Sequence, residues 1–504
     1  RLDDALAAAG DQLEHLRDGS PEHGGIFEAH LAMLSDRKPL DEIRAAISAG
    51  TPAPVAWKRT YDELATTFEG LDDAYQRERA QDVRAVRDRV LRALTGSHTD
   101  GATQDAAHEA APISAAGSIL VIPELDAATA ATLDTARVAG IAVRAAGTTG
   151  HGVIVARSRG IPLITGIGNV DVPAGVLVAF DARVGSFDVA PDEDAVRATI
   201  AERQGEREQA MTQADEPATT VDGRTIAVLV NVGVVQDAVD ARGADGSGLV
   251  RTEVLFGDRR TAPTVDEQVE QFRAIARALQ GKPITIRTWD IGGDKPLPFL
   301  PQDREANPFL GERGIRVFRR RPELLRDQLE AVRRVAAETP VHVMFPMVTT
   351  ADEVTWALDE LGPRSNGLEV GIMVEVPAAA LRIGTLATEL DFVSIGTNDL
   401  TQYTTAADRT NTAVAPLADG LDPAVLQLID HVVRNAGVRV AVCGDLASDP
   451  QAAVLLAALG VEELSAVGPQ VPLVKARLRQ ADLTEVDTAA VLAARDADQV
   501  RGLL

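Results

Sequence analysis

The chain of 504 residues contains a single cysteine, Cys443, and only 3% of its residues are aromatic. One cysteine excludes an internal disulfide and a zinc site built from several cysteines, and it suits a reducing compartment. The sequence also has no apolar run of membrane-spanning length and no visible signal peptide. We therefore expect a cytoplasmic protein without membrane insertion.

Basic residues are scarce as well. The 50 lysines and arginines face 75 acidic residues, which gives a net charge of −25. This balance argues against an extended nucleic-acid surface and against an anionic membrane as partner. The apolar share of 45% is enough for sizeable cores, and roughly 150 residues per domain predicts three or four domains. Because the chain starts at Arg1 within a helical pattern, we expect a preceding segment to be missing.

Residues 1–96 are predicted to form a small antiparallel helical bundle. Three apolar stripes recur at helical spacing, and Pro52 and Pro54 mark a break between helices. The stripes comprise Leu2, Leu6, Ala9, Leu13 and Leu16, then Trp57, Tyr61, Leu64, Phe68 and Leu71, then Val83, Val86, Val90 and Leu94. The stretch from Thr95 to Pro112 has no periodicity, so we expect an exposed linker there.

Residues 97–190 are predicted to form a compact α/β domain. The expected elements are strands near Ile119–Ile122, Ile141–Val143, Pro162–Thr165 and Val176–Ala179, with a helix near Val153–Ser158. The charged segment Asp192–Ala214 favours a connecting helix, which makes residues 191–217 a linker and a candidate swivel.

Residues 218–504 alternate short apolar runs with amphipathic segments, a pattern typical of a (β/α)₈ barrel. The runs are rich in valine and isoleucine and lack strict alternation, which favours parallel strands covered by helices. The eight runs are Ile226–Val230, Ser247–Val250, Pro283–Ile286, Val341–Phe345, Val370–Val374, Val393–Ile395, Arg439–Val442 and Glu463–Val467.

Ionisable residues follow these runs, where a barrel of this kind builds its active site. Glu375 and Asp399 follow the fifth and sixth runs and could supply carboxylate oxygens to Mg²⁺. A ring of salt bridges with neighbouring arginines is the alternative. Asp290 also follows a run, and Lys295 follows the two glycines of DIGGDK, which permit close approach of a ligand.

Four arginines, Arg251, Arg287, Arg313 and Arg409, lie near predicted strand ends. Guanidinium groups suit a ligand that carries both phosphate and carboxylate. Any one of them could instead be a structural partner of an acid, as Arg251 could be for Glu253.

Two further residues carry candidate chemistry. His151 starts a helix behind a Gly- and Thr-rich turn, where backbone N–H groups could receive a phosphoryl group. A solvent-facing loop histidine is the alternative. Cys443 ends the seventh run, where it is either a small buried hydrophobe or a proton donor to a carbanion-like carbon.

Seven segments in order resemble barrel motifs of Enzyme I, the phosphoenolpyruvate-protein phosphotransferase of the bacterial sugar phosphotransferase system. They read GLVRTEVLF, IRTWDIGGDK, NPFLGERGIR, MFPMV, GIMVEVPAAA, SIGTNDLTQYTTAADR and VCGDLASD. The resemblance covers nearly the whole chain. Related enzymes such as pyruvate phosphate dikinase also need a large ATP-grasp domain, for which this chain has no room.

The resemblance implies a role for each matching position. Glu375 and Asp399 are implied as Mg²⁺ ligands, Cys443 as the acid that protonates the enolate, and His151 as the phosphoacceptor. The implied groups that hold phosphoenolpyruvate are Arg251, Arg287, Asn398, Asp399 and Arg409, with Arg313 and Lys295 nearby. The resemblance further implies release of pyruvate, docking of the carrier HPr on the helical bundle, and a homodimer formed through the barrel.

The sequence departs from the family pattern at two matching positions, and we expect the strand-bearing segment that begins the family's phosphohistidine domain to be missing. Gly150 stands where the family usually has serine before the histidine, and Asp445 replaces the usual glutamate of VCGE. Two other hypotheses remain: a phosphoenolpyruvate or pyruvate enzyme of another pathway that uses this barrel, and a regulatory protein that signals through residues 1–96.

Overall fold

The computed structural model describes residues 1–19, 24–70, 74–95, 117–145, 151–182, 185–257, 259–293, 295, 297–303, 305–364, 367–409, 411 and 414–504. The chain divides into two compact units, and the division falls between Thr199 and Ile200. Among the helices described, none is long and apolar enough to cross a membrane.

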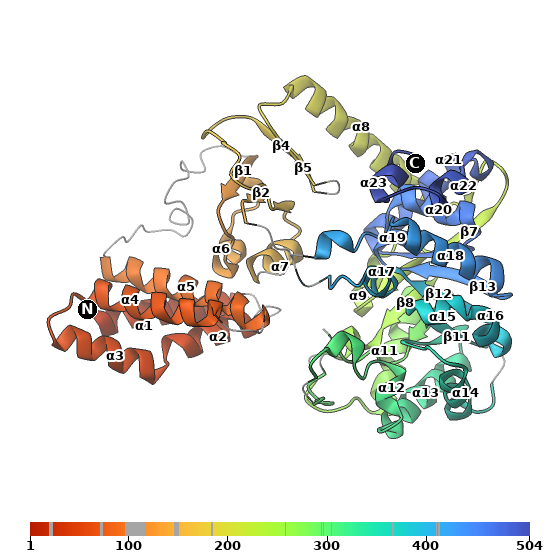
Figure 1. Ribbon diagram of the computed structural model, residues 1–504, viewed down its shortest axis with the longest axis horizontal. Coiled ribbons are helices and arrows are strands. Elements are labelled where there is room, and N and C mark those ends of the chain that lie inside the picture. The colour runs from red at the N-terminus through yellow and green to blue at the C-terminus, as the bar shows by residue number, and fades with distance from the viewer. Residues whose placement is uncertain are drawn as a thin grey trace. The chain divides into compact units, whose positions relative to one another are not determined.

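The first unit begins with the predicted helical bundle, shown in red and orange in Figure 1. Its helices are α1 (Leu2–Gly19), α2 (Gly24–Leu34), α3 (Arg37–Ser48), α4 (Ala53–Glu69) and α5 (Ala74–Thr95). Members of all three predicted stripes are fully buried, including Leu13, Trp57 and Val90. Most stripe residues therefore lie in the bundle core, Leu6, Leu16, Leu64 and Phe68 are partly buried against it, and Leu71 lies outside the described residues. The sequence pattern did not resolve α2 and α3 as separate helices.

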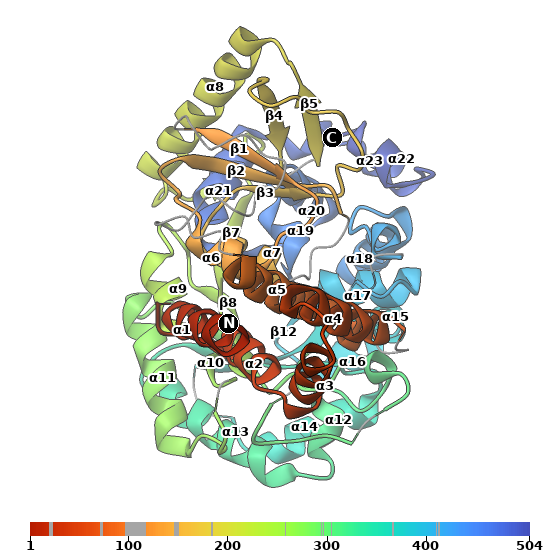
Figure 2. The same ribbon diagram turned by 90° about the vertical axis from the view of Figure 1, so that its left-hand side faces the viewer.

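The α/β part of the first unit contains a small parallel sheet in the order β1-β2-β3 and a separate hairpin of β4 and β5 (Figure 2). The elements are β1 (Ser118–Ile122), α6 (Ala127–Thr132), β2 (Val138–Val143), α7 (His151–Ser158), β3 (Leu163–Thr165), β4 (Val178–Asp181) and β5 (Ser186–Val189). The four predicted strands and the predicted helix are present. The sequence analysis missed α6 and β5.

The predicted connecting helix is α8 (Glu193–Thr212), in which Ala210 is the buried position. The division between the two units lies inside this helix. The linker predicted from Thr95 to Pro112 falls almost entirely outside the described residues.

The second unit is built on a closed parallel barrel of eight strands. The strands are β7 (Thr225–Val232), β8 (Ser247–Arg251), β9 (Ile284–Arg287), β10 (Val341–Phe345), β11 (Leu368–Val374), β12 (Phe392–Gly396), β13 (Arg439–Cys443) and β14 (Glu463–Ala466). Each strand pairs with the next, and β14 pairs with β7 to close the barrel. A short strand, β6 (Ala218–Thr219), adds an antiparallel pairing to β7. All eight predicted runs are therefore barrel strands.

Helices follow the strands around the outside of the barrel, as the green-to-blue part of Figure 1 shows. They are α9 (Val235–Asp240), α10 (Thr252–Leu255), α11 (Val265–Ala278), α12 (Ile315–Phe318), α13 (Pro322–Ala336), α14 (Ala351–Leu361), α15 (Pro377–Leu381), α16 (Ile383–Leu386), α17 (Thr397–Thr405), α18 (Pro423–Asn435), α19 (Asp445–Ser448), α20 (Pro450–Leu459), α21 (Val471–Gln480), α22 (Thr488–Leu492) and α23 (Ala497–Arg501). Local sequence sets several of their starts. Thr264 and Glu267 form a capping box on α11, so the first backbone N–H groups of that helix are satisfied.

Side chains fill the barrel interior, as expected for a barrel of eight strands. Leu249, Met344, Met373, Phe392 and Cys443 form one apolar cluster there. The cluster includes an aromatic ring because Gly371, on the neighbouring strand, has no side chain. A Cβ on that glycine would lie 2.7 Å from ring atoms of Phe392.

Candidate active site

A cavity of about 300 Å³ lies at the carboxyl ends of the barrel strands. Its lining includes eight residues that the sequence analysis proposed for the site. They are Arg251, Arg287, Lys295, Glu375, Asn398, Asp399, Arg409 and Cys443. The remaining barrel residue of that set, Arg313, does not line the cavity and is fully buried behind it.

Asp290 is the central anion of the network beside the cavity. It is fully buried, and its carboxylate pairs with Lys295, with Arg287 Nη1 at 3.2 Å and with Arg313 Nη2 at 3.6 Å. Burial alone would raise the pKa of Asp290, but Arg287, Lys295 and Arg313 hold it below its usual range. Asp290 therefore stays ionised and fixes three cations, a role that the sequence alone did not reveal.

Arg287 has a second buried partner. Its Nη2 donates to Glu253, and the two side chains are only 5% and 4% exposed. The sequence analysis considered Arg251 as the partner of Glu253, whereas the observed ion pair is with Arg287. Its two acidic neighbours raise the pKa of Arg287 despite burial, so the guanidinium is permanently charged.

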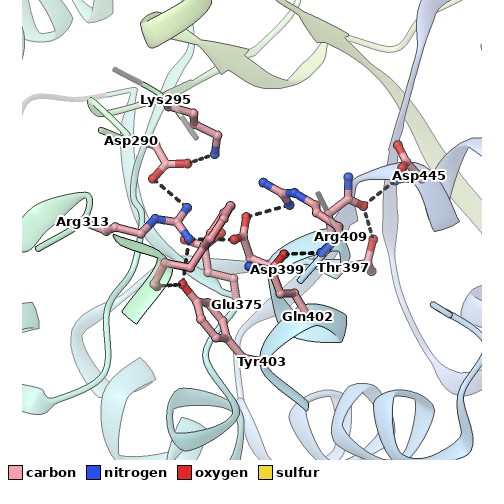
Figure 3. Close-up of polar contacts among 12 residues, drawn as sticks. Asp290, Lys295, Arg313, Glu375, Thr397, Asp399, Gln402, Tyr403, Arg409 and Asp445 are labelled. Carbon is pink, nitrogen blue, oxygen red and sulfur yellow. Dashed lines mark hydrogen bonds and ion pairs between the residues drawn. The ribbon is translucent and has the colours of Figure 1, made fainter. Parts of the chain in front are cut away.

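Asp399 accepts hydrogen bonds from two arginines, as Figure 3 shows. Arg313 Nη1 lies 2.8 Å from one carboxylate oxygen, and Arg409 Nη1 lies 3.4 Å from the other. Arg313 also donates to Tyr403 Oη at 2.7 Å, and Tyr403 in turn donates to the backbone carbonyl of Phe309. These cations hold the pKa of Asp399 below its usual range against the effect of burial. Arg313 thus positions Asp399 from behind.

Glu375 has a different environment. Its Oε1 accepts a hydrogen bond of 2.7 Å from the backbone N–H of Met347. Burial, followed by the negative charges of Asp290 and Asp399, raises the pKa of Glu375 to about 8. The nearby cations therefore offset the cost of a buried negative charge less fully at Glu375 than at Asp399.

Asn398, in the first turn of α17, connects that helix to the start of α19 at the cavity wall. Its Oδ1 accepts from the backbone N–H of Asp445 at 3.1 Å, which leaves the amide NH₂ as the group able to donate to a ligand. Gly444 makes this contact possible because its φ is +108° and a Cβ there would lie 2.8 Å from Asn398 Oδ1. The Asp445 carboxylate is exposed and does not line the cavity, so the shorter side chain at this position leaves the cavity wall unchanged.

Cys443 lines the cavity and is 2% exposed. Burial raises the pKa of its thiol above the usual range, so the sulfur keeps its proton at neutral pH. A protonated thiol at the base of a polar cavity can act as a proton donor.

A wider hollow of about 660 Å³ lies on the helical bundle, lined by residues of α4 and by Leu91. Its charged groups are at the surface, and two of them, Lys58 and Asp62, already pair with each other at 2.5 Å. Because it gathers no buried ionisable groups, we place the candidate active site in the barrel.

Sequence profiles of three PEP-utilising enzyme domains match the chain. The N-terminal domain matches residues 1–79, the mobile domain 114–225 and the PEP-binding domain 207–483. A phosphoenolpyruvate-protein phosphotransferase of Haloferax volcanii is 39% identical, over 96% of this chain and 88% of its own length. The corresponding protein of Priestia megaterium is 35% identical, over 97% of this chain and 88% of its own length.

The chain belongs to the phosphoenolpyruvate-protein phosphotransferase family. A multiphosphoryl transfer protein of Rhodobacter capsulatus is also similar, with 40% identity over 99% of this chain. The chain spans 62% of the length of that relative.

One candidate residue of the sequence lies outside the barrel. His151 is the first residue of α7 in the first unit, within the stretch that matches the mobile domain. The residue after it, Gly152, packs against the backbone of Leu125, and a Cβ there would lie 2.1 Å from the Leu125 carbonyl oxygen. The start of α7 therefore requires glycine at this position. Gly150, the other departure from the family pattern, lies outside the described residues.

The oxygen donors of the barrel cavity suit a divalent cation that prefers oxygen ligands. Within the described part of the chain, no three acidic, histidine or cysteine side chains form a complete metal cage. Glu375 and Asp399 nevertheless supply two buried carboxylates, and Glu253 Oε2 is a buried oxygen without a hydrogen-bond partner. Two protein carboxylates suit Mg²⁺, which usually completes its shell with water and substrate phosphate.

Proposed function

We propose that this chain transfers the phosphoryl group of phosphoenolpyruvate to His151 and then to the carrier protein HPr, with release of pyruvate, as the first step of sugar uptake by the phosphotransferase system. The observation that carries this proposal is the cavity in which Arg251, Arg287 and Arg409 meet the carboxylates Glu375 and Asp399. Membership of the phosphoenolpyruvate-protein phosphotransferase family supports it.

The proposal assigns a task to each part of the chain. Residues 1–96 bind HPr, residues 97–190 carry the phosphohistidine, residues 191–217 are the linker, and residues 218–504 bind phosphoenolpyruvate. The match of residues 114–225 to a mobile domain supports the assignments of the phosphohistidine domain and the linker. Because donor and acceptor lie in different domains, the phosphohistidine domain must move between the barrel and the carrier.

The cations of the cavity hold the substrate. Arg251, Arg287 and Arg409 bind the phosphate and carboxylate oxygens, and guanidinium groups suit both. Lys295 adds positive charge, and the Asn398 amide donates a further hydrogen bond. Arg313 acts through Asp399, because it is fully buried and donates to that carboxylate.

Glu375 and Asp399 are the proposed Mg²⁺ ligands. A divalent cation held there would supply positive charge that offsets the negative charge of the phosphoryl group and of the enolate. Asp399 could hold the ion without losing its arginine partners, because each carboxylate oxygen has two lone pairs and the contact from Arg409 is long, at 3.4 Å. Arg313 can keep its own hydrogen bond to the opposite oxygen of the carboxylate.

The transfer exchanges one bond to phosphorus for another. A neutral imidazole nitrogen of His151 attacks phosphorus, so the N–P bond forms while the bond from phosphorus to the enol oxygen breaks and its electron pair stays with the enolate. The Cys443 thiol then gives its proton to carbon 3, which completes pyruvate, and the thiolate recovers a proton from solvent. Transfer from His151 to HPr regenerates the histidine.

The test is phosphorylation of the full-length protein by labelled phosphoenolpyruvate and Mg²⁺, with and without HPr. We expect an acid-labile, alkali-stable label that moves to HPr, and no label on His151→Ala. His15→Ala is the matched control, because His15 is an exposed histidine of α1 in the same unit. Labelling of His151→Ala at the parent rate contradicts the proposal.

We further propose that the protein works in the cytoplasm as a homodimer formed through the barrel. The single cysteine and the family resemblance support these two points. Sedimentation equilibrium of the whole chain and of the isolated residues 218–504 tests whether a homodimer forms through the barrel. A monomer across the micromolar range contradicts it.

A further inference from the structure

The base of the barrel cavity is apolar, in contrast to its charged walls. Leu249, Met373 and Cys443 line the cavity and are 3%, 1% and 2% exposed. The same three side chains pack with Met344 and Phe392 in a cluster separate from the main barrel core. We call Leu249, Met373 and Cys443 the apolar floor.

Strand geometry places the apolar floor below the charged groups. Leu249 precedes Arg251 by two residues on β8, and Met373 precedes Glu375 by two residues at the end of β11. Residues two apart on a strand point to the same face and lie roughly 6.6 Å apart along it. Because the strands open at their carboxyl ends, Leu249 and Met373 lie one layer deeper than Arg251 and Glu375, whereas Cys443 ends β13 in register with Gly396 and forms the side of the floor.

Met373 is held between two groups of the proposed ligand site. Its Sδ lies 3.4 Å from Arg287 Nη1. A Cβ on Gly396 would lie 3.0 Å from the same sulfur and 3.1 Å from Glu375 Oε2. The sulfur and the Glu375 carboxylate therefore flank one bare backbone position. Closely packed neighbours on both sides leave the Met373 side chain little room to withdraw from an incoming group.

We infer that the apolar floor receives the unsubstituted methylene carbon of an enol phosphate, and that Met373 and Leu249 exclude substrates that carry a substituent on that carbon. This inference rests on the proposed function. The phosphate and carboxylate of the substrate pair with the charged walls, so the apolar end of the molecule points to the floor. Cys443 in the floor then meets carbon 3 directly, and an added methyl group there collides with Leu249 or Met373.

The experiment compares phosphoenolpyruvate with its analogue methylated on carbon 3, 2-phosphooxybut-2-enoate. The rate of phosphoprotein formation is measured for each by intact mass on the full-length protein with Mg²⁺. One methyl group in a tight apolar pocket changes selectivity by roughly 10- to 200-fold, so we expect the parent to prefer phosphoenolpyruvate by a factor in that range. In Met373→Ala the preference should fall at least tenfold.

Two further variants separate the floor from a general loosening of the barrel. Leu249→Ala enlarges the floor from another strand and should also lower the preference. Met344→Ala is the matched control, because Met344 belongs to the same apolar cluster but does not line the cavity. Met344→Ala removes the same side-chain volume as Met373→Ala and should keep the parent's ratio of rates for the two substrates.

Three results overturn the inference: a parent that uses both compounds equally, an unchanged preference in both floor variants, or an equal loss of preference in Met344→Ala. Failure of the parent to form phosphoprotein from phosphoenolpyruvate would instead overturn the proposed function, and this inference with it. The inference is supported if the preference for phosphoenolpyruvate falls in Met373→Ala and Leu249→Ala but not in Met344→Ala.

Discussion

The backbone N–H of Met347 donates to Glu375 Oε1 at 2.7 Å, although Met347 adopts a left-handed backbone conformation with φ of +59°. Such a conformation costs a non-glycine residue roughly 1–2 kcal/mol. Gly314 packs directly against this residue, since a Cβ there would lie 3.0 Å from Met347 Cβ. The strained turn therefore directs a main-chain donor at a proposed metal ligand.

Met347→Val should weaken metal binding at Glu375. A β-branched side chain disfavours positive φ more than methionine does, so the turn should relax and withdraw its N–H group. We expect the free energy of unfolding to fall by about 1–3 kcal/mol and the affinity for Mn²⁺, measured by electron paramagnetic resonance, to fall as well. Met344→Val is the control, because Met344 is equally buried but has no positive φ, and it should leave the Mn²⁺ affinity unchanged. Equal Mn²⁺ affinity in Met347→Val and the parent contradicts this role.

Arg287→Met should reduce both stability and activity. Removing this guanidinium leaves Glu253 without its buried partner, which typically costs about 3–5 kcal/mol. Chemical denaturation measures the loss. Adding Glu253→Leu removes the stranded charge, so the double variant should regain stability but not phosphoryl transfer. Recovery of both would show that Arg287 has only a structural role.

Removal of the metal should abolish labelling of His151 by phosphoenolpyruvate, and Mg²⁺ should restore it after chelation. Asp399→Asn keeps the shape of the side chain but removes one of the two carboxylates, so we expect at least a tenfold loss of Mn²⁺ affinity in a titration. Asp445→Asn is the control, because Asp445 has an exposed carboxylate and its backbone N–H contacts Asn398, the residue next to Asp399. If the two variants bind Mn²⁺ equally, Asp399 is not a ligand.

Gly152→Ala should disrupt the start of α7. The new Cβ would overlap the Leu125 carbonyl, so the helix has to shift and carry His151 with it. We expect slower phosphorylation and a lower melting temperature of the first unit. Gly205→Ala, in α8, is the contrasting helix position, because a Cβ added there would meet open space. At Gly205, alanine should raise stability by up to about 1 kcal/mol.

Cys443 should resist alkylation in the folded protein. Burial raises the pKa of the thiol, so at pH 8 it remains protonated as well as inaccessible, and only the thiolate reacts quickly. Iodoacetamide at pH 8, followed by mass spectrometry, should modify the unfolded chain much faster than the folded one. Rapid modification of the folded protein contradicts a neutral, buried thiol.

The sequence predicted the barrel well because each strand is a short β-branched run bounded by a helix signal. The helices and strands of the first unit were harder to predict from the sequence. The helix α6 is mostly alanine and threonine, and β5 alternates without a strong apolar face, so neither produces a clear periodic pattern. Their existence depends on packing against neighbours.

The site was predictable where residues follow a strand directly, as with Glu375, Asn398 and Arg287. The ion pairs and hydrogen bonds between the site's side chains could not be predicted in this way. Nothing in the spacing indicates that Asp290 pairs with three cations, that Glu253 selects Arg287 over Arg251, or that Arg313 lies behind Asp399. Arg287 and Lys295 are close to Asp290 in the chain, but the contacts of Arg313 with Asp290 and Asp399 and the pair of Glu253 with Arg287 join distant segments, which the closed sheet brings together.

Pairing of β14 with β7 joins strands that lie more than two hundred residues apart in the chain. During synthesis the ribosome has to release residue 466 before the ring can close, so the cavity at the carboxyl ends of the strands cannot form until β14 has emerged. A chain that ends upstream of β14 should therefore retain the first unit but lack the closed barrel and its cavity.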